Sequence, residues 1–94
     1  MEEKCIRWIG SSRKNLLAFP VDARKEAGYQ LSLVQLGDDP EDWKPMRGMG
    51  MGVREIRIHK DGEFRVIYVA TFEEAIYVLH AFAKKNATDS KERY

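Results

Sequence analysis

The sequence predicts an α+β domain in which a helical hairpin packs on one face of a mostly antiparallel sheet. Three observations indicate this fold. Apolar residues recur at helical spacing over residues 21–36, three runs of strand formers follow over residues 53–82, and another short strand-like run lies near the N-terminus. Because short connections join antiparallel neighbours, the expected element order is β-α-α-β-β-β.

The N-terminal part is expected to form one strand and one short helix. Residues 4–9, KCIRWI, are rich in strand formers. Cys5 lies in this apolar run, so we expect a buried and inert thiol. Ser11 or Ser12 is well placed to cap the short helix, and Pro20 ends it.

A longer helix is expected over Val21–Leu36. Gly28 inside it is unfavourable for a helix, and we expect it to mark close packing against the first helix. Gly37 is well placed to cap the C-terminal end. The apolar stripe consists of Ala27, Leu31 and Val34, widened by Leu33 and Leu36.

Residues 37–52, GDDPEDWKPMRGMGMG, contain two prolines and four glycines, so we expect a long loop without regular structure. Trp43 and the methionines of this segment are expected to anchor it to the core. Three strands follow at Val53–His59, Phe64–Thr71 and Ile76–Phe82. The turns KDGE and FEEA join them as antiparallel neighbours.

Length and composition are those of a single globular domain, residues 1–94, with a polar tail at residues 86–94 that resembles a truncated or frayed helix. The net charge is +1, from 16 basic and 15 acidic residues, so bulk charge does not predict a nucleic-acid-binding protein. One cysteine, no long apolar run and no signal peptide in MEEKCIRW favour a cytoplasmic protein with no membrane partner.

Three arginines lie on the predicted hairpin REIRIHKDGEFR. Strand alternation places Arg54 on the isoleucine face, which should meet the helices, and Arg57 on the other face. The strand over residues 64–71 is apolar on both faces, so Arg65 begins a covered strand. If Arg57 and Arg65 share a face, they form a pocket for an anion with Glu55 nearby. Alternatively, Glu55 simply forms a cross-strand ion pair with Arg65, worth about 0.2–1 kcal/mol.

The remaining titratable residues show no metal-binding pattern. His80 is embedded among apolar residues and is expected to lie in the core, whereas His59 lies beside a turn and should be exposed. Lys84 and Lys85 follow the last strand at the sheet edge. The sequence has no zinc motif, P-loop or dinucleotide fingerprint, so we expect neither a metal nor a cofactor.

The element order and the phrases VREIRI, GEFRVIYV and VLHAFAKK resemble the RelE/HigB superfamily of toxins, and most of all its phage-associated HigB-like branch. FPVDARKEAGYQLSLVQLG is similar to the helical hairpin of that branch, and KPMRGMG to its loop before the sheet. The resemblance covers residues 4–86. It implies the toxin of a bacterial type II toxin–antitoxin pair: a ribosome-dependent endoribonuclease that cuts messenger RNA without a metal, using the RNA 2′-hydroxyl as nucleophile.

The resemblance also implies roles for individual residues. Arg57 and Arg65 match the basic positions that bind the scissile phosphate, and Lys84 and Lys85 match the basic pair after the last strand. Glu55 is the candidate general base, and either lysine is a candidate acid. RNA contacts are expected from three further residues, Arg54, His59 and His80, and the two histidines are weaker candidates for the base.

The implied partners are a cognate antitoxin of the helix-turn-helix kind and the ribosome with its messenger RNA. Two other functions stay open: a non-catalytic binding module with the toxin fold, and a gyrase-directed toxin of the ParE kind. The set of Arg57, Arg65, Lys84 and Lys85 favours the nuclease. Family members usually continue into a C-terminal helix and are more basic, so the short end at Tyr94 and the near-neutral charge favour the binding module.

Overall fold

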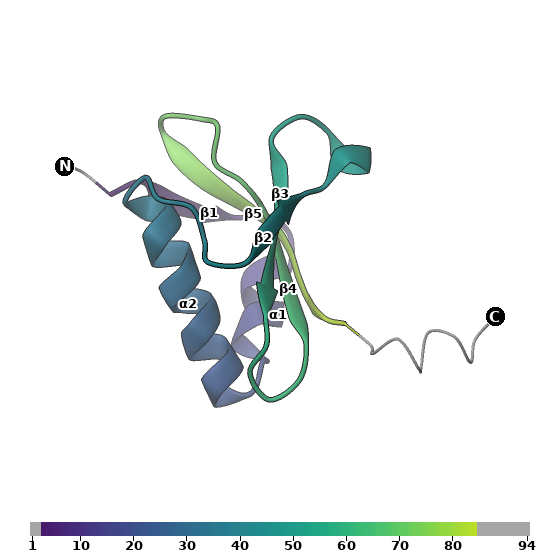
Figure 1. Cartoon of the computed structure of the whole chain (residues 1–94). Coiled ribbons are helices and arrows are strands. Elements are labelled where there is room, and N and C mark those ends of the chain that lie inside the picture. Colours follow the sequence, from purple (N-terminus) through teal and green to yellow (C-terminus); the bar gives the residue numbers. More distant parts are fainter. Residues whose placement is uncertain (1–2, 85–94) are drawn as a thin grey trace.

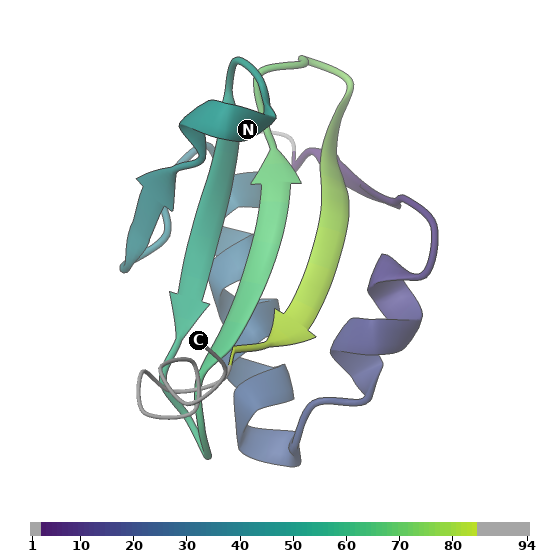
Figure 2. The same ribbon diagram turned by 90° about the vertical axis from the view of Figure 1, so that its right-hand side faces the viewer.

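The computed structural model describes residues 3–84, which form two helices and a five-stranded sheet. Both helices lie on the same side of the sheet (Figures 1 and 2), which confirms the predicted α+β class. No helix in the described range is both long and apolar enough to cross a bilayer. The strands are β1 (Cys5–Trp8), β2 (Trp43–Pro45), β3 (Val53–Ile58), β4 (Phe64–Val69) and β5 (Ala75–Ala83); the helices are α1 (Ser12–Leu17), α2 (Val21–Gln35) and the single-turn 3₁₀ helix η1 (Arg47–Met49).

The sheet order is β1-β5-β4-β3-β2, with β1 parallel to β5 and every other pair antiparallel. Because β1 is an edge strand, alternation turns only Ile6 and Trp8 toward the core. Cys5 is exposed, so the prediction of a buried thiol was wrong.

α1 is held to the sheet by Ser12 rather than capped by it. The buried Ser12 hydroxyl donates a hydrogen bond of 3.0 Å to the carbonyl oxygen of Val78 on β5. Ser11 occupies the N-cap position, but its side chain makes no capping hydrogen bond. The serines therefore fall where a cap was expected, but the stabilising contact joins two elements instead.

α2 ends as predicted, with Gly37 in the left-handed region at φ +93°. The backbone N–H groups of Gly37 and Asp38 donate to the carbonyls of Val34 and Leu33, which satisfies the helix end. The expectation for Gly28 was wrong: this residue is exposed, and a Cβ added there would meet no atom within 4 Å.

Residues 37–52 contain more regular structure than their prolines and glycines indicated. β2 pairs antiparallel with β3, with Trp43 opposite Ile56, and η1 follows it. Met46 packs against the sheet, as expected of an anchor, whereas Met51 is 98% exposed and anchors nothing. The element order thus gains one short strand, and Pro45 is tolerated because β2 lies at the edge.

β4 lies at the centre of the sheet and is buried at every position. On the helix side it contributes to the main core, which includes Ile56, Ile58 and Leu31. On the face turned away from both helices, hereafter the open face, Ile67 and Val69 pack with Val53 in a smaller cluster. The prediction of a central strand covered on both sides is therefore confirmed.

A β-bulge in β5 changes which side chains reach the open face. Ile67 pairs with His80 and Tyr68 with Val78, so Leu79 is an extra residue in the ladder. Strict alternation would put His80 on the same side as the buried Val78. The bulge instead turns His80 to the open face, where it is exposed, so the expectation of a core histidine was wrong.

Leu31→Ala is expected to lower the free energy of unfolding by about 2–5 kcal/mol, because Leu31 is 2% exposed in the main core. Leu36→Ala is the matched control at the end of the same helix. Leu36 is 46% exposed, so its replacement should change the free energy by no more than about 0.5 kcal/mol. Urea unfolding of both variants checks this, and equal losses would contradict the packing described.

Candidate functional site

Arg57 on β3 and Arg65 on β4 lie directly opposite each other. Both belong to the open face, as strand alternation predicted for Arg57, and the condition that the two arginines share a face is met. The side chain of Arg65 is only 7% exposed and that of Arg57 is 32% exposed. Two like charges in a cross-strand pair are destabilising unless counter-charges accompany them, so the surrounding carboxylates define the site.

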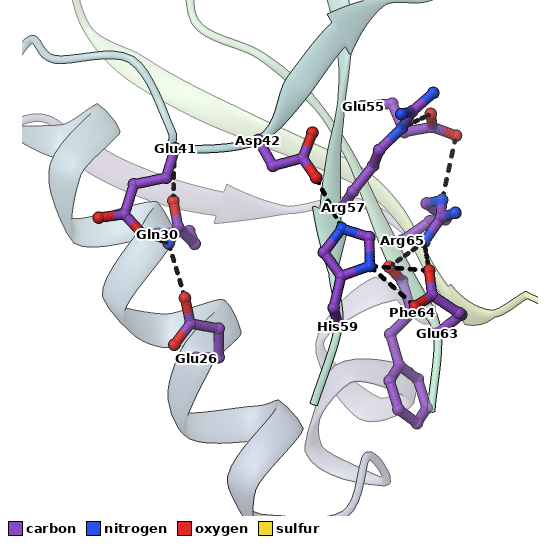
Figure 3. Close-up of polar contacts among 10 residues, drawn as sticks. All are labelled: Glu26, Gln30, Glu41, Asp42, Glu55, Arg57, His59, Glu63, Phe64 and Arg65. Carbon is purple, nitrogen blue, oxygen red and sulfur yellow. Dashed lines mark hydrogen bonds and ion pairs between the residues drawn. The ribbon is translucent and has the colours of Figure 1, made fainter. Parts of the chain in front are cut away.

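Glu55 supplies a carboxylate that lies between both arginines (Figure 3). One of its oxygens lies 3.6 Å from Arg57 Nε and the other lies 3.9 Å from Arg65 Nε, distances of ion pairs rather than of hydrogen bonds. Within the described residues, both Nε atoms are buried and have no hydrogen-bond partner. The predicted pairing of Glu55 with Arg65 therefore exists as an ion pair, and neither Nε–H is satisfied by a hydrogen bond among the described residues.

Arg65 is oriented by its Nη1 group. This group donates hydrogen bonds to Glu63 Oε1 at 3.1 Å and to the carbonyl oxygen of Phe64 at 2.9 Å. Both acceptors lie at the end of the β3–β4 hairpin, next to the strand that carries the arginine. The guanidinium is thereby held on one side while its Nε faces the Glu55 side.

His59 lies between two carboxylates (Figure 3). Its Nδ1 is 2.8 Å from Glu63 Oε2, and its Nε2 is 2.6 Å from Asp42 Oδ2. Hydrogen bonding to Glu63, and then to Asp42, raises the pKa of His59 above its ordinary value of 6.5. The hydrogen bond from His59 in turn lowers the pKa of Glu63. The His59 ring therefore links the loop before β2 to the carboxylate that holds Arg65.

A buried glutamine fixes the loop that carries Asp42. The amide nitrogen of Gln30 donates to Glu26 at 2.7 Å and to Glu41 at 3.0 Å, and its oxygen accepts the backbone N–H of Glu41 at 2.8 Å. The next residue, Asp42, accepts the backbone N–H of Arg57 through its carbonyl at 2.8 Å. Gln30 on α2 thus helps to position Asp42, and with it the contact between Asp42 and His59, from the other layer of the fold.

Sequence reasoning missed most of these supporting residues. It predicted Arg57, Arg65 and Glu55 as a group, but it gave no role to Glu63 or Gln30. The available signal was the run of acids in residues 37–43, GDDPEDW, close in the chain to a hairpin rich in arginine. Only the pairing of β2 with β3 brings that run beside the hairpin.

The other predicted residues are not all gathered at this site. The backbone N–H of Lys84 donates to the carbonyl of Glu63 at 2.8 Å, which keeps this exposed lysine beside the end of the hairpin. Lys85 lies outside the described residues. His80 is exposed on the open face, opposite Ile67 and two pairs along the strand from Arg65.

Arg54 lies on the helix side of the sheet, apart from the arginine pair. Its Nη1 forms an ion pair with Asp39 at 2.9 Å, and its guanidinium lies over the Trp43 ring at 4.0 Å from the centroid. These contacts account for Arg54 as an anchor of the loop before β2. It is therefore a suitable comparison residue for the open-face arginines.

The arrangement of Arg57, Arg65 and Glu55 is suited to an anion with several acceptor oxygens, such as a phosphate group. Two guanidinium groups would face the anion, and a carboxylate would lie within reach of a proton on it. Among residues 3–84, no group of three or more His, Cys, Asp or Glu side chains is arranged to hold a metal ion.

Comparison with known proteins gives one family match. The model of the family described as "Phage derived protein Gp49-like (DUF891)" matches residues 14–93, which is most of the chain. Neither the curated proteins nor the solved structures include a match to this sequence.

His59→Gln is expected to remove a pH-dependent part of the stability. Because the folded-state pKa of His59 is raised above 6.5, its contribution is fully present below about that pH and is lost as the pH rises through the folded value. Glu63, whose pKa is lowered from 4.5, stays ionised at the acidic end of this range. Thermal unfolding of both proteins from about pH 5.5 to about pH 9 should show a difference that shrinks as the pH rises.

His80→Gln is the control for this experiment, because His80 forms no hydrogen bond or ion pair with the described residues. The melting temperature of His80→Gln should differ little from that of the wild type at every pH measured. If the melting temperatures of His59→Gln and the wild type differed by the same amount over the whole pH range, the contribution of His59 to stability would not depend on its protonation.

Proposed function

This chain belongs to the Gp49-like family of phage-derived, toxin-like proteins, and on that premise we propose that it is the toxin of a bacterial toxin–antitoxin pair. The proposed activity is that of the RelE/HigB superfamily: ribosome-dependent, metal-independent cleavage of messenger RNA. The observation that carries it is the opposed pair of Arg57 and Arg65. Each has a buried Nε with no hydrogen-bond partner in residues 3–84. Unsatisfied buried donors are costly, and a functional role is one of the established reasons that a folded protein keeps them.

The reaction follows from placing the scissile phosphate against the two arginines. The RNA 2′-oxygen attacks phosphorus, the bond to the 5′-oxygen breaks, and a 2′,3′-cyclic phosphate and a 5′-hydroxyl result. Negative charge on the non-bridging oxygens increases in the transition state, where the guanidinium groups of Arg57 and Arg65 stabilise it. Because Arg65 is held by Glu63 and Phe64, it needs little reorganisation when the phosphate binds.

Two proton transfers complete the reaction. Glu55, whose side chain is 9% exposed and lies beside both guanidinium groups, is proposed to take the 2′-proton. Lys84 or Lys85 is proposed to give a proton to the leaving 5′-oxygen. Strand pairing supports the first of these lysines by placing its backbone beside Glu63.

The expected RNA contacts differ in how well the structure supports them. His80 is exposed on the open face and is placed to meet RNA that runs past the arginine pair. Both ring nitrogens of His59 are occupied by carboxylates, so its proposed contribution is to hold the site together. Arg54 is paired with Asp39 on the other side of the sheet, which makes direct RNA contact the least supported of the three.

The proposed partners are a cognate antitoxin of the helix-turn-helix kind, and the ribosome with its messenger RNA. Family membership supports the antitoxin. The ribosome is proposed from the resemblance to RelE/HigB toxins. A site on an open sheet face can contact a messenger RNA strand that the ribosome holds in place. A chain that is harmless when expressed alone in bacteria would contradict the toxin function.

One observation favours a second function, that of a non-catalytic binding module. The positive charges of the site, Arg57, Arg65 and the protonated His59, are matched by the carboxylates Glu55, Glu63 and Asp42. A balanced cluster of this kind also serves as a structural ion network. The following experiments separate the two functions. Substitutions at the site remove messenger-RNA cleavage and keep the fold if the chain is a nuclease, whereas a binding module has no cleavage activity to lose.

Arg57→Ala is expected to reduce messenger-RNA cleavage on translating ribosomes about 10²–10³-fold, since a preorganised charge at the phosphate is lost. Its stability should change little, because Arg57 is partly exposed and its ion pair is long. Arg54→Ala is the control. It removes an arginine from the helix side of the same strand and should keep the wild-type cleavage rate. Cleavage by Arg57→Ala at the wild-type rate would leave the arginine pair as a structural network.

Arg65 needs a different substitution, because its side chain is buried and an alanine would remove one of the two counter-charges of both Glu63 and Glu55. Arg65→Lys keeps the charge but removes Nε and the planar fork. We expect a folded protein with strongly reduced cleavage. Retention of full activity by this variant would show that Nε does not contact the phosphate.

Glu55→Gln separates catalysis from anion binding, because the two should change in opposite directions. Without the carboxylate, binding of inorganic phosphate to the arginine pair should become tighter. Cleavage should fall about 10²-fold or more if Glu55 takes the 2′-proton. Phosphate titration followed by NMR and the ribosomal cleavage assay measure the two effects; unchanged or faster cleavage would exclude Glu55 as the base.

A further inference from the structure

We propose that Phe82 on β5 is the platform on which an RNA base stacks while the adjoining phosphate lies on Arg57 and Arg65. This inference rests on the proposed function, because it names how the same site recognises its substrate. Phe82 lies directly opposite Arg65 in the β4–β5 pairing. Opposed residues in a sheet point to the same face, so the phenyl ring and the two guanidinium groups share the open face.

The β-bulge is the reason that Phe82 lies there. If the residues of β5 alternated strictly from Val78 onward, with no bulge at Leu79, Phe82 would lie on the helix side together with the buried Val78. With it, Ala81 enters the main core and Phe82 is left 41% exposed. Bulges that redirect side chains are common beside active sites, and this one moves an aromatic ring from the core side to the arginine side.

The spacing suits one nucleotide. Side chains opposed across two strands have Cβ atoms about 4.5–5.5 Å apart. Within a nucleotide, phosphate and base are joined through a single sugar. A phosphate held by Arg65 and Arg57 therefore has a neighbouring base within reach of the Phe82 ring. Every base has a π-face, so stacking there accepts any base and selects for a nucleotide over a bare anion.

Phe72 is the contrasting aromatic residue on the same face. It is 49% exposed, similar to Phe82, but its ring packs edge-on against Tyr77 at 5.4 Å between centroids. It follows the end of β4 at Val69, whereas Arg65 lies near the start of that strand. Exposure of an aromatic ring alone therefore does not distinguish the two, and only Phe82 adjoins the arginine pair.

The test uses short 2′-O-methyl oligoribonucleotides, which lack the attacking hydroxyl, in two forms: one with all bases and one with a single abasic residue next to the central phosphate. Fluorescence anisotropy of a labelled oligonucleotide gives the affinity for each protein. Phe82→Leu should weaken binding of the complete oligonucleotide about tenfold and leave binding of the abasic form unchanged. Phe82→Trp should bind as tightly as the wild type or more tightly, and Phe72→Leu should match the wild type in both.

Several outcomes would overturn the inference: equal binding of the complete oligonucleotide by Phe82→Leu and the wild type, an equal loss for both oligonucleotides, or no binding by the wild type. An equal loss identifies a structural role, and the Trp variant guards against misfolding of the Leu variant. Base-dependent binding without cleavage on ribosomes would support Phe82 and contradict the nuclease. Cleavage at the wild-type rate by a Phe82→Leu variant that also binds normally would support the nuclease and contradict Phe82.

Discussion

The like-charged pair of Arg57 and Arg65 is the constraint on which the rest of the open face depends. The β3–β4 register places them opposite each other, and such a pair is unfavourable unless negative charge accompanies it. Glu55 and Glu63 supply that charge from the same two strands and their turn. His59 then has a role of its own, because its hydrogen bond lowers the pKa of Glu63 and its ring joins Glu63 to Asp42.

The two layers of the fold contribute differently to this site. The main core lies between the helices and the sheet, whereas Arg57, Arg65 and Glu55 lie on the open face. α2 still acts on the open face at a distance, through the buried Gln30 that holds Glu41 next to Asp42. A chain of hydrogen bonds therefore connects this helix, through Glu41 and Asp42, to His59.

Periodicity predicted the parts of the fold that packing alone determines. The stripe of Ala27, Leu31 and Val34 is buried as expected, and the three hairpin strands lie within one or two residues of their predicted bounds. β2 escaped prediction because three residues that include Pro45 form a strand only when β3 is beside them. Cys5 and Gly28 were misjudged for the same kind of reason, since sequence does not show which edge or surface lacks a neighbour.

The site was predictable only where strict alternation holds. It holds along β3, so the separation of Arg54 from Arg57 and Glu55 was correct. It fails in β5, where one inserted residue exchanges the two faces of the strand and moves His80 out of the predicted core. No composition signal marks that bulge, because Leu79 is an ordinary strand former.

The charge of the whole chain is a poor guide to the chemistry of this face. A net charge of +1 is lower than is usual among proteins that bind RNA, but the acids that lower it include the residues that orient the arginines. Glu63 and the backbone of Phe64 use one end of the Arg65 guanidinium and leave Nε on the other side. Removing such acids would raise the net charge and loosen the pocket at the same time. Near-neutrality is therefore compatible with a preorganised anion site, because preorganisation itself requires fixed counter-charges.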